Sequence, residues 1–435
     1  MIRILGIELR RSVSVGAALL IIAVGAIVFH ATAGRWSTGW MALVTTQREY
    51  LAVLSPLAMA AGAWQSYREH RANVAELFAG VPRPRPQRIV PILAATALAV
   101  LAAYLLTLLA TGPRIAGTAR YLPPAAYAVV AVGVLTMIAS VWLGLAVGRM
   151  VPALATAPAL AVAGFVLLVF APHALPDGGI SVAFSPMGTS MFSDYDTVGG
   201  AVSTAQALWM AAVALAAVVL FAVRKRVLGL TALLPLAVGA TVTALVVPTG
   251  AAYDRSTLDT VAQELVCTDD APRVCVSRAH KGLLPEVAPK ARHALDLLSK
   301  TPVTEAHEDT TTFFPPTAPT PRSDTALMKV SVDKRGHLAD ADEFELSLLV
   351  GAFTGPYSCE DNQNFPVAVA TAYWLLDLKP SDSLDGFPLD DPGTVTLWKS
   401  LKKLPRAEAD ARVTAVHRAA QKCRDTNGIL TRGTR

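Results

Sequence analysis

The sequence predicts an all-α polytopic membrane domain of seven helices with its N terminus inside, followed by a mostly α-helical extracytoplasmic domain with disulfides. Three observations lead to this fold class. Of the 435 residues, 53% are apolar and only 16% are charged, and the mean hydropathy is +0.44, which is the balance of a membrane protein. The long apolar runs lie in residues 1–250. All four cysteines lie in residues 251–435.

Seven apolar stretches can cross a hydrocarbon core of about 30 Å as helices of roughly 17 to 25 residues. The second is the shortest, and Pro56 predicts a kink in it. A cleaved signal peptide is the alternative for the first, because small residues follow it at positions 31–33, but its run exceeds the usual core of about 7 to 15 residues. The predicted spans are 13–29, 51–64, 91–109, 126–147, 153–171, 207–223 and 228–247.

The basic side chains predict the orientation. Residues 1–250 hold 16 basic and 7 acidic side chains, and residues 251–435 hold 22 and 26. With the N terminus inside, the inner segments hold twelve of the 16, and the outer segments hold only Arg35, Arg48, Arg114 and Arg120. Lys and Arg favour the cytoplasmic side, so we expect a multi-pass protein of the plasma (inner) membrane with residues 251–435 outside. The basic excess lies beside apolar runs, which argues against nucleic-acid binding.

The inner segment after the second span contains a predicted amphipathic helix. It reads WQSYREHRANVAELFAGVPRPRPQRIV over residues 64–90, with apolar side chains at helical spacing. Gly80 and the prolines after it end the helix. One interpretation is a surface helix on the inner leaflet, with its arginines close to anionic lipid. The other is a docking helix for a cytoplasmic partner.

Three segments give the chain a family resemblance: IELRRS before the first span, YREHRANVAELFAGVPRPRPQRI after the second, and LGLAVGRMVPALATAPALA between the fourth and fifth. Residues 1–225 resemble the membrane permease subunit of type-2 ABC exporters, in the version common in actinobacteria. The resemblance implies a coupling helix at residues 67–78 that receives force from a separate cytoplasmic ABC ATPase subunit. The family core has six spans with both ends inside, so the seventh span and the outer domain are additions. The implied ATPase-docking residues are Tyr67, Arg68, Glu69, Arg71, Glu76, Leu77 and Phe78.

Two further patterns concern partners. The sequence has no G-x-x-x-x-G-K-[ST] phosphate loop, so an ATPase must be another polypeptide. Ser140, Gly144 and Gly148 recur every four residues along the fourth span, a small-residue stripe that lets another helix approach closely. Packing within the chain is one interpretation of the stripe, and a homodimer face is the other. A second copy or a second permease subunit is expected, because seven helices give no two-fold path.

The cysteines Cys267, Cys275, Cys359 and Cys423 predict disulfides in an oxidising compartment. We favour the pairs Cys267–Cys275 and Cys359–Cys423, because the first closes a short hairpin. Zinc ligation is the alternative, but no CxxC or HxxxH spacing supports it, and we expect no metal or cofactor. In the outer domain we expect helices over 344–353 and 365–376, a strand at 329–333 and a loop over 301–321.

No catalytic motif is present: the sequence has neither HExxH nor G-x-S-x-G. His280, His293, His307 and His337 are scattered, and we expect them to be solvated. No ionisable side chain falls in the middle of a predicted span, which argues against proton coupling. The leading hypothesis is therefore a non-enzymatic permease subunit of an ABC transporter, of the exporter type. The alternative is a membrane-anchored extracellular binding or sensory protein without transport, and a hydrolase is a weaker third.

Overall fold

The computed structural model describes residues 14–71, 85–174, 184–185, 187, 191, 193–223, 229–247, 256–313, 316–317, 322–355, 364–380 and 392–431. The chain forms two compact units. Unit 1 comprises Met1–Trp36, Trp40–Ile115 and Leu122–Asp259, and unit 2 comprises Ser37–Gly39, Ala116–Tyr121 and Thr260–Arg435.

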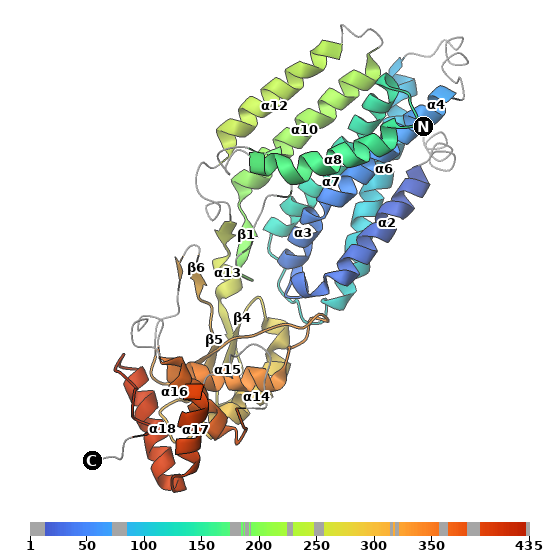
Figure 1. Ribbon diagram of the computed structural model, residues 1–435. Helices are drawn as coiled ribbons and strands as arrows, with labels where there is room; N and C mark the ends of the chain where they lie inside the picture. Colours follow the sequence, from blue (N-terminus) through green and yellow to red (C-terminus); the bar gives the residue numbers. More distant parts are fainter. Residues whose placement is uncertain are drawn as a thin grey trace. The chain divides into compact units, whose positions relative to one another are not determined.

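Unit 1 is a bundle of apolar helices (Figure 1). Its helices are α2 (Ser14–Ala31), α3 (Trp40–Glu49), α4 (Leu51–Arg71), α6 (Arg85–Thr111), α7 (Ala125–Met150), α8 (Thr156–Ala174), α10 (Gly200–Ala222) and α12 (Leu233–Val246). Short 3-10 turns lie at η1 (Ala33–Arg35), η2 (Gly112–Arg114) and η3 (Leu230–Ala232), and strands at β1 (Asp196–Val198) and β2 (Ser256–Leu258).

A helix lies at each of the seven predicted apolar stretches, but they differ in length and hydropathy. Within the described residues, four are long and apolar enough to cross a membrane, namely α2, α6, α7 and α10. Thr156–Phe170 of α8 and Leu230–Val246 are shorter apolar helices. Helix α4 has 21 residues, but its last two turns are polar. Among the described residues, four candidate spans and further shorter apolar helices are thus consistent with the predicted membrane protein.

Helix α7 lies at the centre of unit 1, where it packs against α3, α4, α6 and α10. Helices α2 and α8 pack on α4, and α12 packs on α10. The small-residue stripe of α7 lies against α4 of the same chain: a Cβ added to Gly144 would overlap the carbonyl of Met59, and one on Gly148 would lie 2.6 Å from the Cα of Ala63. Ser140 of the stripe is 9% exposed. Glycine permits this backbone-to-backbone contact because it has no side chain.

Helix α3 was not anticipated, because its sequence is too polar to register as an apolar run. It carries seven buried residues out of ten. The backbone N–H of Tyr50 donates to Thr46 O, and that of Leu54 donates to Tyr50 O, so α3 continues almost directly into α4. The polar segment before the second span is therefore part of the packed bundle rather than an outer loop.

Strands β1 and β2 join two distant parts of unit 1. They pair antiparallel, with Asp196 opposite Leu258 and Val198 opposite Ser256. Strand β1 follows α8, and β2 follows α12. The chain segments after these two helices therefore lie together.

Unit 2 is a mixed α/β domain, so the expectation of a mostly helical outer domain was incomplete. Its sheet has the order β3-β4-β5-β8, antiparallel between β3 and β4 and parallel elsewhere. These strands are β3 (Leu265–Cys267), β4 (Val274–Ser277), β5 (Glu305–Glu308) and β8 (Thr325–Met328), and β6 (Thr312–Phe313) pairs with β7 (Pro316–Thr317). Its helical elements are α13 (Thr260–Gln263), η5 (Lys281–Leu283), α14 (Leu284–Leu297), α15 (Ala341–Thr354), α16 (Phe365–Leu375), α17 (Pro392–Lys402) and α18 (Arg406–Ala420).

Two local expectations for unit 2 were wrong. The segment 301–321 was expected to be a loop but contains β5, whose buried Ala306 and Glu308 alternate with half-buried residues. The strand expected at 329–333 lies earlier, at β8, and only Val332 forms an isolated bridge, with Leu338. The helices expected over 344–353 and 365–376 are α15 and α16, whose apolar residues form one core with α14 and the sheet.

Candidate functional site

The predicted ATPase-docking residues lie at the C-terminal end of α4. Tyr67, Arg68, Glu69 and Arg71 occupy the last turns of that helix rather than the start of a separate one. The Gln65 side chain donates a hydrogen bond of 2.9 Å to Glu69. Glu76, Leu77 and Phe78 lie outside the described residues.

The same end of α4 is tied to α7. The Ser66 hydroxyl donates to the carbonyl of Leu145 at 2.8 Å. A Cβ on Gly62 would overlap the carbonyl of Val141. Since these contacts reach backbone atoms, the two helices cannot slide past each other without losing them. A displacement of the end of α4 would therefore move α7.

Helix α7 is in turn tied to α10. The Arg149 guanidinium donates to the carbonyl of Phe221 at 2.9 Å and lies 5.0 Å from the centre of the Phe221 ring. A cation at the last turn of α7 also interacts favourably with the helix dipole. The ends of α4, α7 and α10 thus form one connected group.

A buried polar cluster lies where α3 meets α6 and α7. Gln47, Arg48 and Tyr104 are each 0% exposed. The Gln47 side chain donates to the carbonyl of Tyr104 at 2.7 Å. A Cβ on Gly133 of α7 would overlap the Tyr104 hydroxyl, so the absence of a side chain there admits the phenol ring. This places a guanidinium group inside an otherwise apolar bundle.

Aromatic and polar contacts surround the cluster at the junction of α2, η1 and α3. Trp36 is 0% exposed and donates through Nε1 to the carbonyl of Phe29 at 3.0 Å. The Phe29 ring meets Trp36 and Tyr50 edge to face at centroid distances of 5.9 and 5.4 Å. The Arg35 guanidinium pairs with Glu49 at 2.7 Å. These contacts fix the polar cluster from the side of the α2–α3 connection.

Arg48 was not expected to be buried, because the sequence places it in a predicted outer segment. The prediction that no ionisable side chain falls in the middle of a span is not contradicted, because Arg48 lies on α3, before the second predicted span, but the structure adds a buried guanidinium group to the bundle. The helical spacing of the residues before the second span could have indicated that Arg48 is buried. Val44 and Arg48 precede Leu51 at spacings of seven and three residues, which places them on the same helical face.

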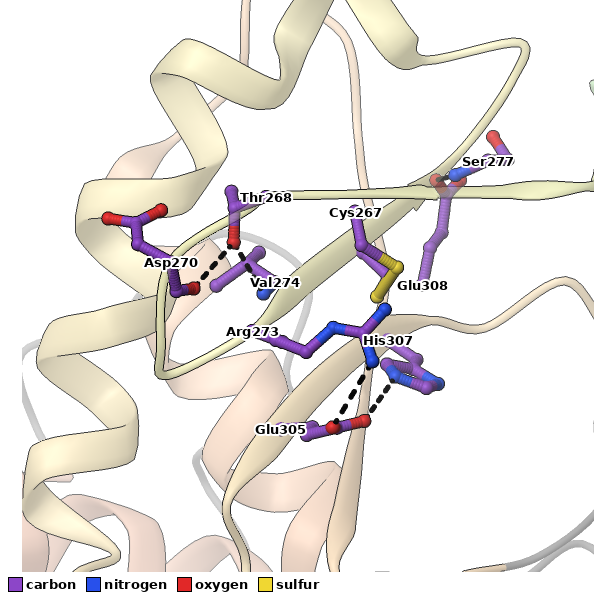
Figure 2. Close-up of a disulfide and its surroundings, with 10 residues drawn as sticks. Cys267, Thr268, Asp270, Arg273, Val274, Ser277, Glu305, His307 and Glu308 are labelled. Carbon is purple, nitrogen blue, oxygen red and sulfur yellow. Dashed lines mark hydrogen bonds and ion pairs between the residues drawn. A yellow bond between two sulfur atoms is a disulfide. The ribbon is translucent and has the colours of Figure 1, made fainter.

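The predicted disulfide between Cys267 and Cys275 is present in unit 2 (Figure 2). It joins residues that face each other on β3 and β4. The turn between them is closed by Thr268, whose hydroxyl donates to Asp270 O and accepts from the Val274 N–H, both at 3.2 Å. Cys423 is disulfide-bonded as well, and Cys359 lies outside the described residues. Among the described residues, no group of His, Cys, Asp and Glu is arranged to hold a metal ion.

A buried histidine–carboxylate pair lies beside this hairpin. His280 and Glu308 are each 2% exposed, so the expectation of a solvated His280 was wrong. His280 Nδ1 lies 2.5 Å from Glu308 Oε1 and 3.3 Å from Ser277 Oγ. Because serine and carboxylate meet the same ring nitrogen, this arrangement is not that of a nucleophile–base–acid triad. Its role is structural, since Glu308 Oε2 also accepts the Ser277 N–H at 2.6 Å.

His293, His307 and His337 also have carboxylate neighbours. In Figure 2, Glu305 reaches both His307, at 3.0 Å, and Arg273, at 3.9 Å. Burial lowers the pKa of His307 below its ordinary value, and the hydrogen bond to Glu305 opposes that shift. His293 contacts Glu345 at 2.9 Å, and His337 contacts Glu286 at 2.8 Å. None of these pairs includes a nucleophile.

Comparisons of the chain with protein-family models, with curated proteins and with solved structures gave no match. The assignment of a function therefore depends on the architecture described above and on the resemblance of the three sequence segments.

Proposed function

We propose that the chain is the membrane permease subunit of an ABC transporter of the exporter type, driven by an ATPase on a separate polypeptide. One observation carries this proposal. Four of the implied docking residues, Tyr67, Arg68, Glu69 and Arg71, lie on α4, and the backbone of α4 touches that of α7 at Gly62, Gly144 and Gly148. A partner that moved the end of α4 would therefore reposition the central helix of the bundle.

The segments that connect the apolar helices support seven membrane crossings rather than four. Ser37–Gly39 follows α2 and Ala116–Tyr121 follows α6, and both belong to unit 2. Strands β1 and β2 follow α8 and α12, and they pair with each other. These are the first, third, fifth and seventh apolar helices of unit 1, and alternate crossing puts the segments after all four on one side. The arginine distribution predicts that this side is extracytoplasmic.

The Arg48 cluster is a buried polar feature of the bundle. Ionisable groups buried among membrane helices often belong to substrate or ion pathways, because burying them costs free energy. A guanidinium group recognises carboxylate and phosphate through paired N–H donors. We infer that the transported molecule carries an anionic or strongly polar group that passes Arg48.

Co-purification tests the proposed function. The full-length tagged chain is isolated in mild detergent, and bound proteins are identified by mass spectrometry. We expect a phosphate-loop ATPase with the unmodified chain, and its recovery to fall at least about tenfold when Glu76→Lys and Phe78→Ala are combined, since interface residues of this kind dominate binding energy. Glu264→Lys, at an exposed carboxylate of unit 2, is the matched control and should leave recovery unchanged.

The second candidate is a membrane-anchored extracellular binding or sensory protein. The separate core of unit 2 favours it, because that unit has the size and the disulfide of an independent external module. Recovery of no ATPase, or equal recovery from the double variant and the control, would contradict the permease proposal and favour this candidate.

A further inference from the structure

The connection between α6 and α7 folds as part of unit 2. Residues Ala116–Tyr121 belong to that unit although the helices on either side belong to unit 1. Thr118 is 9% exposed and Ala119 is 7% exposed, which is unusual for the tip of a connecting loop. The side chain of Arg120 remains exposed and donates to the carbonyl of Gly117 at 3.0 Å.

The loop contacts Gly282, which lies in the middle of η5. A Cβ placed on Gly282 would overlap the backbone carbonyl of Thr118. Any side chain at position 282 would therefore displace the loop. By contrast, a Cβ on Gly117, one residue from Thr118, meets nothing within 4 Å. The close approach is thus confined to one glycine.

The residues before Gly282 are held rigidly. The buried Glu308 carboxylate on β5 accepts the Ser277 N–H at 2.6 Å and contacts His280 Nδ1 at 2.5 Å. The His280 N–H donates to Ser277 O, and the Leu283 N–H donates to His280 O at 2.8 Å. We name the segment His280–Leu283 the loop seat. Because a buried carboxylate fixes its start, the seat is part of the sheet framework of unit 2.

We propose that the loop seat holds the α6–α7 connection as a conformational restraint on residues Ala116–Tyr121. Opening of the seat would free the backbone of this connection. The restraint does not depend on transport and would operate equally in a sensory protein.

Limited trypsin digestion of the full-length chain in detergent tests the restraint. The peptide bond after Arg120 can be cleaved only when the loop leaves its seat, since a protease needs an extended, unpacked backbone. Gly282→Ala should accelerate cleavage after Arg120 by roughly five- to a hundredfold, because overpacking a tight contact favours the open form. Gly117→Ala, the matched control in the same loop, should match the unmodified chain. Equal rates for both variants would overturn the proposal.

Gly282→Ala could unfold unit 2, and cleavage after Lys290 and Arg292 of α14 would reveal such unfolding. A second variant tests the restraint in that case. Glu308→Gln adds no bulk and keeps an acceptor for the Ser277 N–H, but it weakens the contact with His280. It should accelerate cleavage after Arg120 about two- to tenfold without exposing α14. Cleavage after Arg120 at the unmodified rate, or only together with α14, would contradict the restraint.

Discussion

The two units bury apolar side chains in opposite ways. In unit 2 the large apolar residues of helices and sheet gather in one core. In unit 1 many point outward: Leu234 of α12 is 68% exposed, Leu245 is 81% exposed, and Val162 of α8 is 65% exposed. A soluble protein rarely exposes many large apolar side chains together. The exposed apolar residues of unit 1 are consistent with helices that contact lipid, whereas unit 2 is built around a hydrophobic core.

The interiors differ as well. Unit 1 packs through glycine and alanine with backbone against backbone, because apolar burial gives no driving force between helices in lipid. Unit 2 packs large side chains such as Phe353 and Tyr373, and it encloses polar pairs such as His280 with Glu308. Substitutions should therefore affect the units through different mechanisms.

The largest expected effect is at the contact between α4 and α7. Gly144→Val would drive a branched side chain into the backbone of Met59, so we expect a loss of about 3 kcal/mol or more in bundle stability. Gly16→Val is the control, since a Cβ there meets nothing within 4 Å. Thermal unfolding in detergent measures both. A Gly144→Val protein as stable as the control would refute the intramolecular packing of α7 on α4.

Removal of the hairpin disulfide should affect unit 2 alone. Cys267→Ala combined with Cys275→Ala frees a loop with a sequence separation of 8, which should cost about 2 to 3 kcal/mol. Hydrogen exchange of α14 and α15 should quicken, while that of α7 should not change. Equal effects on both units would show that they unfold as one cooperative body.

A smaller effect concerns the pH dependence of unit 2. His417 is buried, its Nδ1–H donates to Ala352 O at 2.8 Å, and burial lowers its pKa below the ordinary value. Above a pH of about 6.5, both folded and unfolded states hold a neutral ring. Below it the unfolded state takes up a proton first, so stability falls by at most about 1.4 kcal/mol per pH unit. Exchange of α18 at pH 7.5 and 5.5 should show this loss, and His417→Gln should reduce it. If the His417→Gln variant lost as much stability between pH 7.5 and 5.5 as the unmodified chain, His417 would not be the cause of the pH dependence.

The smallest effect is expected at Arg48. If this side chain is retained for function, Arg48→Met should leave stability within about 1 kcal/mol of the unmodified chain or raise it, because a buried charge is removed. Leu54→Ala, at a fully buried neighbour on α4, should cost about 2 to 5 kcal/mol. Thermal unfolding of the two variants decides the point. A loss of several kcal/mol for Arg48→Met would make it a structural residue.

The same contrast explains what the sequence could predict. Apolar runs located seven helices of unit 1 to within several residues at most ends, because lipid demands continuous hydropathy. Helix α3 was missed because it mixes apolar with polar residues and its burial depends on α6 and α7. In unit 2, β5 has the charged sequence EAHE. Its Glu308 can be buried because its carboxylate contacts His280 and the Ser277 N–H. Such burial is a tertiary property, and no local pattern encodes it.

The most direct test of the account is the side of the membrane on which unit 2 lies. Sealed right-side-out and inside-out vesicles containing the full-length chain are treated with a membrane-impermeant maleimide, with and without an impermeant reductant. We predict that the cysteines are labelled only after reduction and only in right-side-out vesicles. Labelling confined to inside-out vesicles, or labelling without reduction, would contradict the placement of unit 2 outside and the seven crossings with it.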